Sequence, residues 1–361
     1  MTSPRDLLRG SYWPTIGLLL VAPLHAVGQA GPDQLTLEPL VELQSADAPV
    51  VPSLHQSIVH AGDRGNGSFL VSYLYREPVI AVYDDTGSFE RLYDSQGEGP
   101  GEFQFYPKLF RGPEGSVLAF ENGRLHRFDG ELQHRDTRTL ARRVFQTMAA
   151  LPDGRVVVDD MPTTTSGSTP TFSVLDPTGD LDVDGMELAD PMVRTLIAPA
   201  SEGEFWTLRG SGILLERRNA DGTVVHGAEV EGGAVEPWTT GRIEGEGRDV
   251  PRRARYTGLA DLGDGTLLLV AWVAPEDWEP AEESDEDTVL DPGLIDANQE
   301  YDTVVEHVDA SSGQVLADLR VPHALVTVKG APRLLHSRHP VGDVGHVLTR
   351  IWQVRVPPNG L

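Results

Sequence analysis

Two families of glycine-containing turns alternate along this chain, and their alternation constrains the fold more than any other feature. Turns of the first family begin with an apolar residue or Asn, pass through Asp and end in Gly. Asp accepts hydrogen bonds from its own backbone and Gly tolerates positive φ, so both residues suit hairpins between strands. The first family consists of Tyr83–Gly87, Phe128–Gly130, Leu175–Gly179, Asn219–Gly222 and Val308–Gly313.

The second family interleaves with the first, and apolar β-forming segments follow most of its members. Its members are Asp63–Gly67, Gly112–Gly115, Pro152–Gly154, Ser201–Gly203, Gly263–Gly265 and Gly342–Gly345. Two turn classes that alternate with a period of roughly 40–50 residues describe four-stranded units, which is the spacing of β-propeller blades. The six turns of this family predict six blades. The 38 Gly and 27 Pro agree with many short strands joined by frequent turns.

The last blade needs an outer strand from elsewhere, because the first turn family has only five members. Leu35–Leu43 precedes the first complete blade and can supply that strand, which would close the ring and remove two exposed edges. We interpret the run 346–356 as two strands of this blade, although no turn residue separates them. The predicted fold class is therefore all-β, a six-bladed β-propeller closed by pairing of the N- and C-terminal strands.

Residues 1–30 have the layout of a secretory signal peptide. Two arginines give a positive start, the apolar run Ile16–Leu24 follows, and Gly28 and Ala30 provide small side chains before a cleavage site. A buried N-terminal strand or a signal anchor is the alternative. No other segment approaches the ~20 apolar residues of a membrane helix. We expect a periplasmic or secreted protein without a membrane span, with residues 31–361 forming one propeller domain.

An acidic insert at about 274–300 interrupts the fifth blade between its second and third strands. Its acids and prolines cannot bury enough apolar area to fold alone, so we interpret it as a surface excursion over one face of the ring. Trp278 in this insert and Trp238 in the connection Gly232–Arg255 are apolar groups in polar loops. They are candidates for a binding rim, and isolated exposed aromatic residues without function are the alternative.

Charge and cysteine content exclude several classes of partner and site. The chain has 29 Lys and Arg against 55 Asp and Glu, a formal net charge of −26 that repels nucleic acid and anionic membranes. The absence of cysteine excludes disulfides, thiolate metal sites and cysteine nucleophiles. Cationic ligands and a simple demand for solubility both agree with the acidity. We expect a monomer.

No pattern in the sequence predicts a metal or a catalytic centre. Asp180–Gly185 begins like a calcium loop, but the twelfth position is Pro191 where such a loop needs a bidentate Glu, so a strand is the preferred interpretation. Ca²⁺ held by the acidic insert is retained as an alternative to a protein without cofactors. The histidines lack zinc-ligand spacing, although inner strands could bring distant ones together around the axis.

The segment Gln96–Phe103 (QGEGPGEF) is the most distinctive short motif. Its glycines and proline exclude helix and regular strand, so we interpret it as the crossing from the outer strand of one blade to the inner strand of the next. Glu102 can accept backbone N–H groups there, and Phe103 can pack between two blades. A phosphate cradle is disfavoured, because no strand–loop–helix surrounds the motif. The structural motif residues are Gly97, Gly99, Pro100, Gly101, Glu102 and Phe103.

These crossing residues, with Pro107 one position late, resemble the G-x-GPGEF-x-x-P motif of exported six-bladed β-propellers of environmental bacteria, which are distant relatives of NHL-repeat propellers. The motif covers one blade boundary, and the repeat pattern extends the likeness over about 35–357. The resemblance implies an architectural role for the motif and supplies no catalytic residue. The acidic insert and the turnless last blade depart from the family pattern.

Three functional hypotheses follow from the sequence. The first is a non-catalytic exported scaffold that binds a peptide, glycan or protein on one face of the disk. The second is a metal-dependent hydrolase, lactonase or lyase with its site at the central channel, which requires acidic, amide or imidazole ligands from at least three blades. The third is docking to an envelope or cell-surface assembly.

Overall fold

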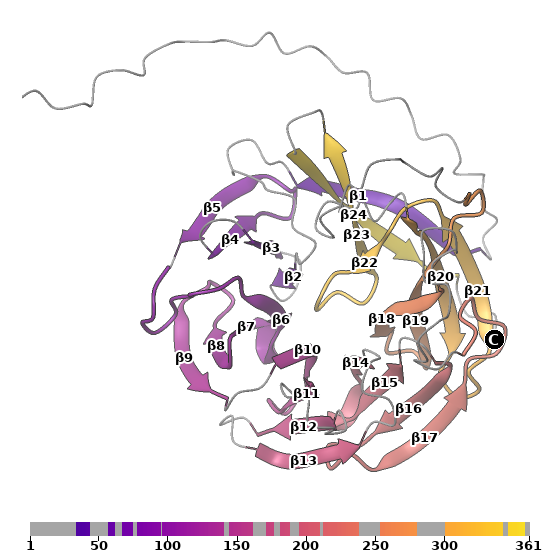
Figure 1. The fold of residues 1–361 in the computed structure, drawn as a ribbon, viewed down its shortest axis with the longest axis horizontal. Coiled ribbons are helices and arrows are strands. Elements are labelled where there is room, and N and C mark those ends of the chain that lie inside the picture. Colours follow the sequence, from indigo (N-terminus) through magenta and orange to yellow (C-terminus); the bar gives the residue numbers. More distant parts are fainter. Residues whose placement is uncertain are drawn as a thin grey trace, which may run out of the picture.

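The computed structural model is a β-propeller in which six four-stranded antiparallel sheets surround a central axis (Figure 1). The predicted fold class is therefore confirmed. The structure describes residues 34–43, 57–61, 67–74, 78–94, 96–140, 144–161, 171–176, 181–187, 195–209, 212–237, 253–279, 300–341 and 346–357. The predicted signal peptide and most of the acidic insert lie outside these residues. Within them, no helix is long and apolar enough to cross a membrane.

Each blade is numbered by its order along the chain and has its strands in sequence from the axis outward, except that the outer strand of blade 6 is the N-terminal strand β1. Blade 1 is β2 (Ser57–Ala61), β3 (Ser68–Leu74), β4 (Pro78–Tyr83) and β5 (Phe89–Asp94); blade 2 is β6 (Lys108–Arg111), β7 (Val117–Glu121), β8 (Arg124–Phe128) and β9 (His134–Thr139). Blade 3 is β10 (Val144–Ala150), β11 (Val156–Met161), β12 (Thr171–Leu175) and β13 (Leu181–Glu187).

The remaining three blades follow the same plan. Blade 4 is β14 (Thr195–Pro199), β15 (Phe205–Arg209), β16 (Leu214–Arg218) and β17 (Val224–Glu229); blade 5 is β18 (Arg255–Asp261), β19 (Thr266–Val273), β20 (Asp302–Asp309) and β21 (Val315–Val321). Blade 6 is β22 (Val326–Thr327), β23 (Leu334–Val341), β24 (His346–Arg355) and β1 (Thr36–Leu43).

Strand sequence follows radial position within a blade. The second strand β19 reads TLLLVAWV and is buried along almost its whole length, because neighbouring blades cover both of its faces. The outer strand β21 reads VLADLRV and alternates between half-buried and exposed positions. One face of an outer strand packs inward and the other meets water, which explains the alternation.

The ring closes where β1 pairs with β24, from Thr36 opposite Arg355 to Leu43 opposite Thr349. The predicted pairing of the N- and C-terminal strands is therefore confirmed. A register shift between Pro39 and Val41 leaves Leu40 pointing to solvent. A second contact joins the same blades near the axis, where Lys329 exchanges backbone hydrogen bonds with Ile58 and His60 at 2.9 and 3.0 Å.

The last blade differs from its prediction in two respects. His346–Arg355 forms one strand, not two, which explains why no turn residue interrupts it. Gly342–Gly345 joins the second and third strands of the blade, whereas other members of its turn family join first and second strands. The equivalent turn in blade 6 lies between β22 and β23, where Gly330 adopts a φ of 78°. The blade count was right although one of its six turns was misassigned.

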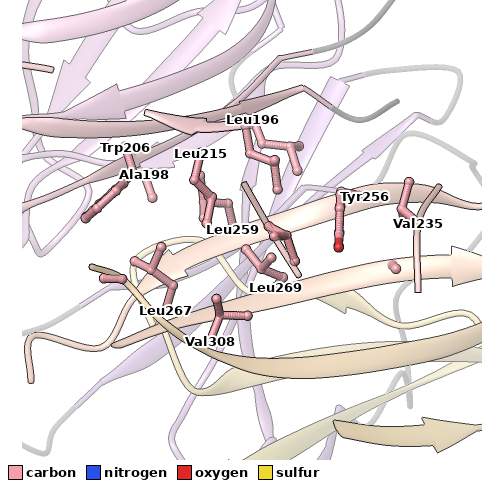
Figure 2. Packing of buried hydrophobic residues seen from close by; sticks show 14 of the residues in the cluster. Leu196, Ala198, Trp206, Leu215, Val235, Tyr256, Leu259, Leu267, Leu269 and Val308 are labelled. Atoms are coloured by element: carbon pink, nitrogen blue, oxygen red, sulfur yellow. The ribbon is translucent and has the colours of Figure 1, made fainter. Parts of the chain in front are cut away.

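The hydrophobic core is divided among the boundaries between adjacent blades. Figure 2 shows the cluster between blades 4 and 5, in which Leu196, Trp206 and Leu215 meet Leu259, Leu267 and Val308. The Trp206 indole N–H donates to Asp261 Oδ2 at 3.1 Å across this boundary. Similar clusters lie at the other five boundaries, so each blade is stabilised mainly by its two neighbours.

Two leucines of β1 test the closure. Leu43 is 2% exposed in the cluster that joins blades 6 and 1, whereas Leu40 is 49% exposed on the same strand. We expect Leu43→Ala to lower the free energy of unfolding by about 2–4 kcal/mol, because it leaves a cavity at the closing contact. Leu40→Ala is the control and should change it by less than about 0.5 kcal/mol. Equal effects in chemical denaturation would contradict this role of β1.

Candidate functional site

Connections between antiparallel strands divide between two faces of the ring. Turns that join first to second and third to fourth strands share one face, which we call the turn face. Connections between second and third strands, and from each outer strand to the next blade, share the opposite loop face. The crossing Gln96–Phe103, between β5 and β6, and the acidic insert, between β19 and β20, therefore start and end on the loop face.

The crossing is held by hydrogen bonds within its own backbone. The Gly97 N–H donates to the Phe103 carbonyl and the Glu102 N–H to the Gly99 carbonyl, each at 3.0 Å. The Glu102 carboxylate accepts the Gly99 N–H at 2.8 Å. A Cβ at Gly97 would lie 1.9 Å from Glu102 Oε2, and Gly101 has a φ of 80°. Both positions favour glycine, and the N–H groups of Gly97, Gly99 and Glu102 are used inside the loop.

Phe103 anchors the crossing between blades 1 and 2. Its ring is fully buried in a cluster that includes Val59 and Leu70 from blade 1 and Leu109 from blade 2. The ring centroid lies 5.0 Å from that of His126, in an edge-to-face arrangement. Aromatic contacts of this geometry add to the stabilisation from buried area.

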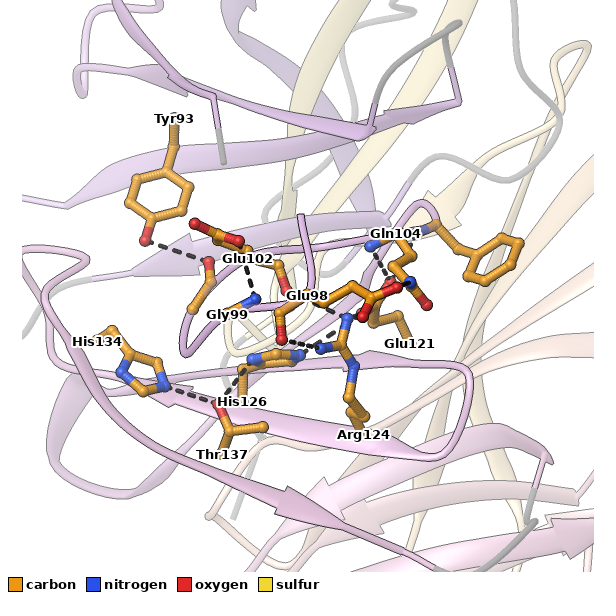
Figure 3. Close-up of polar contacts among 12 residues, drawn as sticks. Tyr93, Glu98, Gly99, Glu102, Gln104, Glu121, Arg124, His126, His134 and Thr137 are labelled. Carbon is orange, nitrogen blue, oxygen red and sulfur yellow. Dashed lines mark hydrogen bonds and ion pairs between the residues drawn. The ribbon is translucent and has the colours of Figure 1, made fainter. Parts of the chain in front are cut away.

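Glu121, at the end of β7, fixes the remainder of the crossing (Figure 3). Its Oε2 accepts the backbone N–H groups of Gln104 and Phe105 at 2.8 and 2.6 Å. Its Oε1 pairs with Arg124, which also donates to the carbonyl oxygens of Glu98 and Glu102 at 3.1 and 3.3 Å. One buried ion pair thus links both ends of the loop to blade 2.

Burial raises the pKa of Glu121, but the neighbouring His126 and the hydrogen bonds from Phe105 and Arg124 outweigh it and hold the pKa below its usual range. The carboxylate is therefore ionised at neutral pH. His126 is also held by Thr137, whose hydroxyl lies 2.9 Å from its Nδ1. The buried His126 Nε2 lies 3.7 Å from Glu121 Oε1 and has no hydrogen-bond partner among the described residues, whereas the other contacts of this network join the loop to blade 2 and stabilise the blade 1–2 boundary.

Only one of the two tryptophans proposed as a binding rim lies among the described residues, so the rim stays a prediction. Trp238 lies outside them. Trp278 is half-buried, and its backbone N–H donates to the Pro275 carbonyl at 3.2 Å. Trp272 and Tyr301, on either side of the acidic insert in the sequence, form an aromatic pair with ring centroids 5.0 Å apart. The Arg255 guanidinium lies 5.4 Å from each ring and covers the pair.

A second buried acid, Glu306 on β20, lies between blades 4 and 5. It accepts the Tyr256 hydroxyl at 3.0 Å and the Ala234 backbone N–H. Burial raises the pKa of Glu306, and these two hydrogen bonds only partly oppose it. Burial is the largest influence on the pKa of both acids; the neighbouring His126 and the hydrogen bonds from Phe105 and Arg124 reverse its effect at Glu121, whereas the hydrogen bonds from Ala234 and Tyr256 do not reverse it at Glu306.

The enzymatic hypothesis requires ligands or a nucleophile gathered at one place. Among the described residues, no group of three or more His, Asp or Glu side chains could hold a metal ion. Ser337 Oγ lies 2.8 Å from His339 Nε2, which is the spacing of a nucleophile and its base. Ser337 is buried, however, and its oxygen accepts the Trp352 indole N–H at 2.8 Å. Its position in the blade 5–6 boundary favours a structural role.

Among the described residues, a groove between blades 2 and 3 is a candidate ligand site. It has a volume of about 290 Å³ and opens among turns of the turn face. Its floor consists of the aliphatic side chains of Leu118, Leu125, Val156 and Leu175. Arginines and carboxylates surround that floor, namely Arg127, Arg135, Arg138, Glu114, Asp129, Asp136 and Asp176. An apolar floor with a few convergent charged groups is the usual composition of a ligand site.

Sequence reasoning missed this groove, although a signal was present. The segment Arg124–Arg138 carries four arginines in a chain that is strongly acidic overall. The register of the hairpin decides which side chains lie together: Arg127 pairs with Asp136, and Leu125 pairs with Arg138, across β8 and β9. Paired residues share a face of the sheet, so Arg127, Asp136, Leu125 and Arg138 project together toward blade 3. This arrangement could be predicted only with the exact length of the turn at Phe128–Gly130, because that length sets the register of β8 and β9.

Comparison with known proteins extends the fold assignment. No family model and no curated protein matches the chain. A DUF4221 family member from Bacteroides vulgatus superposes with a TM-score of 0.56 at 10% identity, over 90% of this chain and 100% of its own. A protein from Bacteroides fragilis described as exported gives 0.54 at 12% identity, over 91% and 97%.

A luciferin-regenerating enzyme also superposes, with a TM-score of 0.50 at 9% identity, over 90% of this chain and 96% of its own. At identities this low the comparisons show a shared six-bladed propeller fold. They do not extend to the NHL-like assignment or to the crossing motif.

The Glu121 network yields a stability prediction. Glu121→Ala removes the acceptor of two backbone N–H groups and leaves Arg124 without its buried carboxylate. We expect the free energy of unfolding to fall by about 3–5 kcal/mol. The matched control is Glu131→Ala, an exposed acid of the same blade, which should cost less than about 0.5 kcal/mol. A cost below 1 kcal/mol for Glu121→Ala in urea denaturation would show that the network is dispensable.

Glu306 yields a pH prediction. The pKa of Glu306 is higher in the folded protein than in the unfolded chain. The free energy that Glu306 contributes to stability is therefore fully present below its unfolded pKa of 4.5 and is lost as pH rises toward the folded pKa. Glu306→Gln removes that titration. We expect the difference in stability between Glu306→Gln and the natural protein to shift in favour of the variant as pH rises from 4.5. Thermal unfolding of both proteins at a series of pH values measures this difference. A difference independent of pH would mean that Glu306 does not titrate differently on folding.

Proposed function

We propose that this chain is a non-catalytic, exported β-propeller that binds a peptide segment in the groove between blades 2 and 3. The observation that carries the proposal is the aliphatic floor, about 290 Å³ in volume, enclosed by charged side chains. That volume is near the lower end of small-ligand sites and suits a few side chains better than an extended oligosaccharide. The aliphatic floor favours peptide side chains, because sugars stack preferentially on exposed aromatic rings.

Export to the periplasm or beyond is part of the same proposal. It is supported by the signal-peptide layout of residues 1–30 and by the exported description of the Bacteroides fragilis neighbour. Membership of the exported NHL-like propellers rests on the crossing residues Gly97–Phe103. A monomeric state, the absence of a cofactor and Ca²⁺ binding by the acidic insert stay predictions, as does a binding rim at Trp238 and Trp278.

Gly130 allows the groove to be blocked without disturbing the core. It lines the groove, is exposed, and a Cβ added to it would lie 3.5 Å from the Gly115 carbonyl oxygen, an ordinary contact. Gly227 on β17 is equally exposed, with a Cβ contact of 3.8 Å to the Leu215 carbonyl oxygen. Gly130→Trp and Gly227→Trp therefore form a matched pair, of which only the first fills the groove.

The test is selection of a phage-displayed random peptide library against the immobilised protein, followed by titration of the enriched peptides as synthetic molecules. We expect Gly130→Trp to weaken their binding at least tenfold and Gly227→Trp to leave it unchanged. Thermal unfolding of both variants verifies that they fold. Enrichment of no peptide, or peptides that bind Gly130→Trp as well as the natural protein, would overturn the proposal. Binding of oligosaccharides in a parallel glycan array, without peptide binding, would also contradict it.

A further inference from the structure

On the blade 2 side of the groove, three guanidinium groups pair with only two carboxylates. Asp136 pairs with Arg127 and also lies 3.5 Å from Arg138, so two guanidinium groups share one carboxylate. Arg135 pairs separately with Asp129 at 2.6 Å. The side chains of Arg127 and Arg138 are 43% and 34% exposed, which leaves their remaining donors accessible from the groove.

Asp129 and Asp136 differ in how much of their charge is already balanced locally. The Asp129 carboxylate accepts the backbone N–H groups of Glu131 and Gln133 at 3.0 and 2.8 Å, in addition to Arg135. Asp136, in contrast, interacts with the two guanidinium groups on its own face of the sheet. Each guanidinium has five N–H donors in a planar fork, more than one shared carboxylate can accept. The Arg127–Asp136–Arg138 triad therefore carries an excess positive charge.

We propose that this triad binds a carboxylate of the peptide ligand, while an adjacent aliphatic side chain of the peptide packs on Leu125 and its neighbours. The inference rests on the proposed peptide-binding function and names the chemistry that the groove selects. Leu125 and Arg138 are register partners on the same face, so a carboxylate at the triad places the neighbouring residue over the floor. Either a C-terminal carboxylate or an Asp or Glu side chain supplies this chemistry.

The remaining acids of the groove set the orientation of the ligand. Glu114 and Asp176 lie at the turn-face end, where η1 (Pro113–Gly115) and the end of β12 meet the groove. Arg138 lies farther along β9 from that end, opposite Leu125. A ligand carboxylate near Glu114 would be repelled, whereas one at Arg138 is attracted. The acidic end accommodates backbone N–H groups or a cationic side chain of the same peptide.

The test uses synthetic peptides from the library selection in four forms: free C-terminal acid, C-terminal amide, and each of these with internal Asp and Glu replaced by Asn and Gln. Affinity is measured for the natural protein and for Arg127→Gln, Arg138→Gln and Arg355→Gln. Arg355 on β24 pairs with Glu38 at 2.5 Å, far from the groove in the fold, and provides the control. The terminal amide identifies a C-terminal source, and the internal replacements identify a side-chain source.

We expect neutralisation of one carboxylate to weaken binding to the natural protein about tenfold or more. The same neutralisation should have less than a threefold effect on Arg127→Gln or Arg138→Gln, and its full effect on Arg355→Gln. The inference is overturned if every neutral form binds as tightly as the acid, or if both arginine variants retain the preference. Such peptides would still be blocked by Gly130→Trp, which separates this failure from failure of the peptide-binding function. Absence of any peptide binding overturns both.

Discussion

Packing between neighbouring blades is the interaction on which the rest of the structure depends. Each four-stranded sheet is too small to bury its own faces, so its apolar residues pack against the sheets on either side. Such an arrangement has two unpaired edges unless the ring closes, and β1 supplies the closing strand beside β24. The crossing at Gly97–Phe103 and the Glu121–Arg124 pair serve the same requirement at one boundary, because they fix the distance between blades 1 and 2.

The groove arises from the same geometry. Toward the turn face, buried aliphatic residues of the cluster between blades 2 and 3 line the groove, and charged groups of β8 and β9 border them. Blade 2 provides the strands that border the groove, and the register of its β8–β9 hairpin determines which side chains meet. The proposed peptide binding therefore requires no movement of the ring. It needs only that Arg127 and Arg138 are held beside an apolar floor by the hairpin that also carries Asp136.

The sequence was sufficient to predict the blades but not the groove. Turn residues such as Asp84 and Gly87 act through local hydrogen bonds and backbone conformation, so they can be identified without knowing their neighbours. Closure by Leu35–Leu43 followed from counting strands. The turn of blade 6 was misassigned because Gly330 lies in a segment without Asp or Glu, while Gly342–Gly345 contains Asp like most members of the second turn family. Arg127, Asp136 and Leu125 meet only through register and through packing between blades, neither of which local composition specifies.

A crystal structure of the protein with one of the selected peptides, determined beside the free protein, tests the central claim most directly. The account predicts density for the peptide between blades 2 and 3 on the turn face, with a carboxylate within hydrogen-bonding distance of Arg127 or Arg138 and an aliphatic side chain on Leu125. Density on the loop face, or a peptide in the groove whose carboxylates point to solvent, would contradict it.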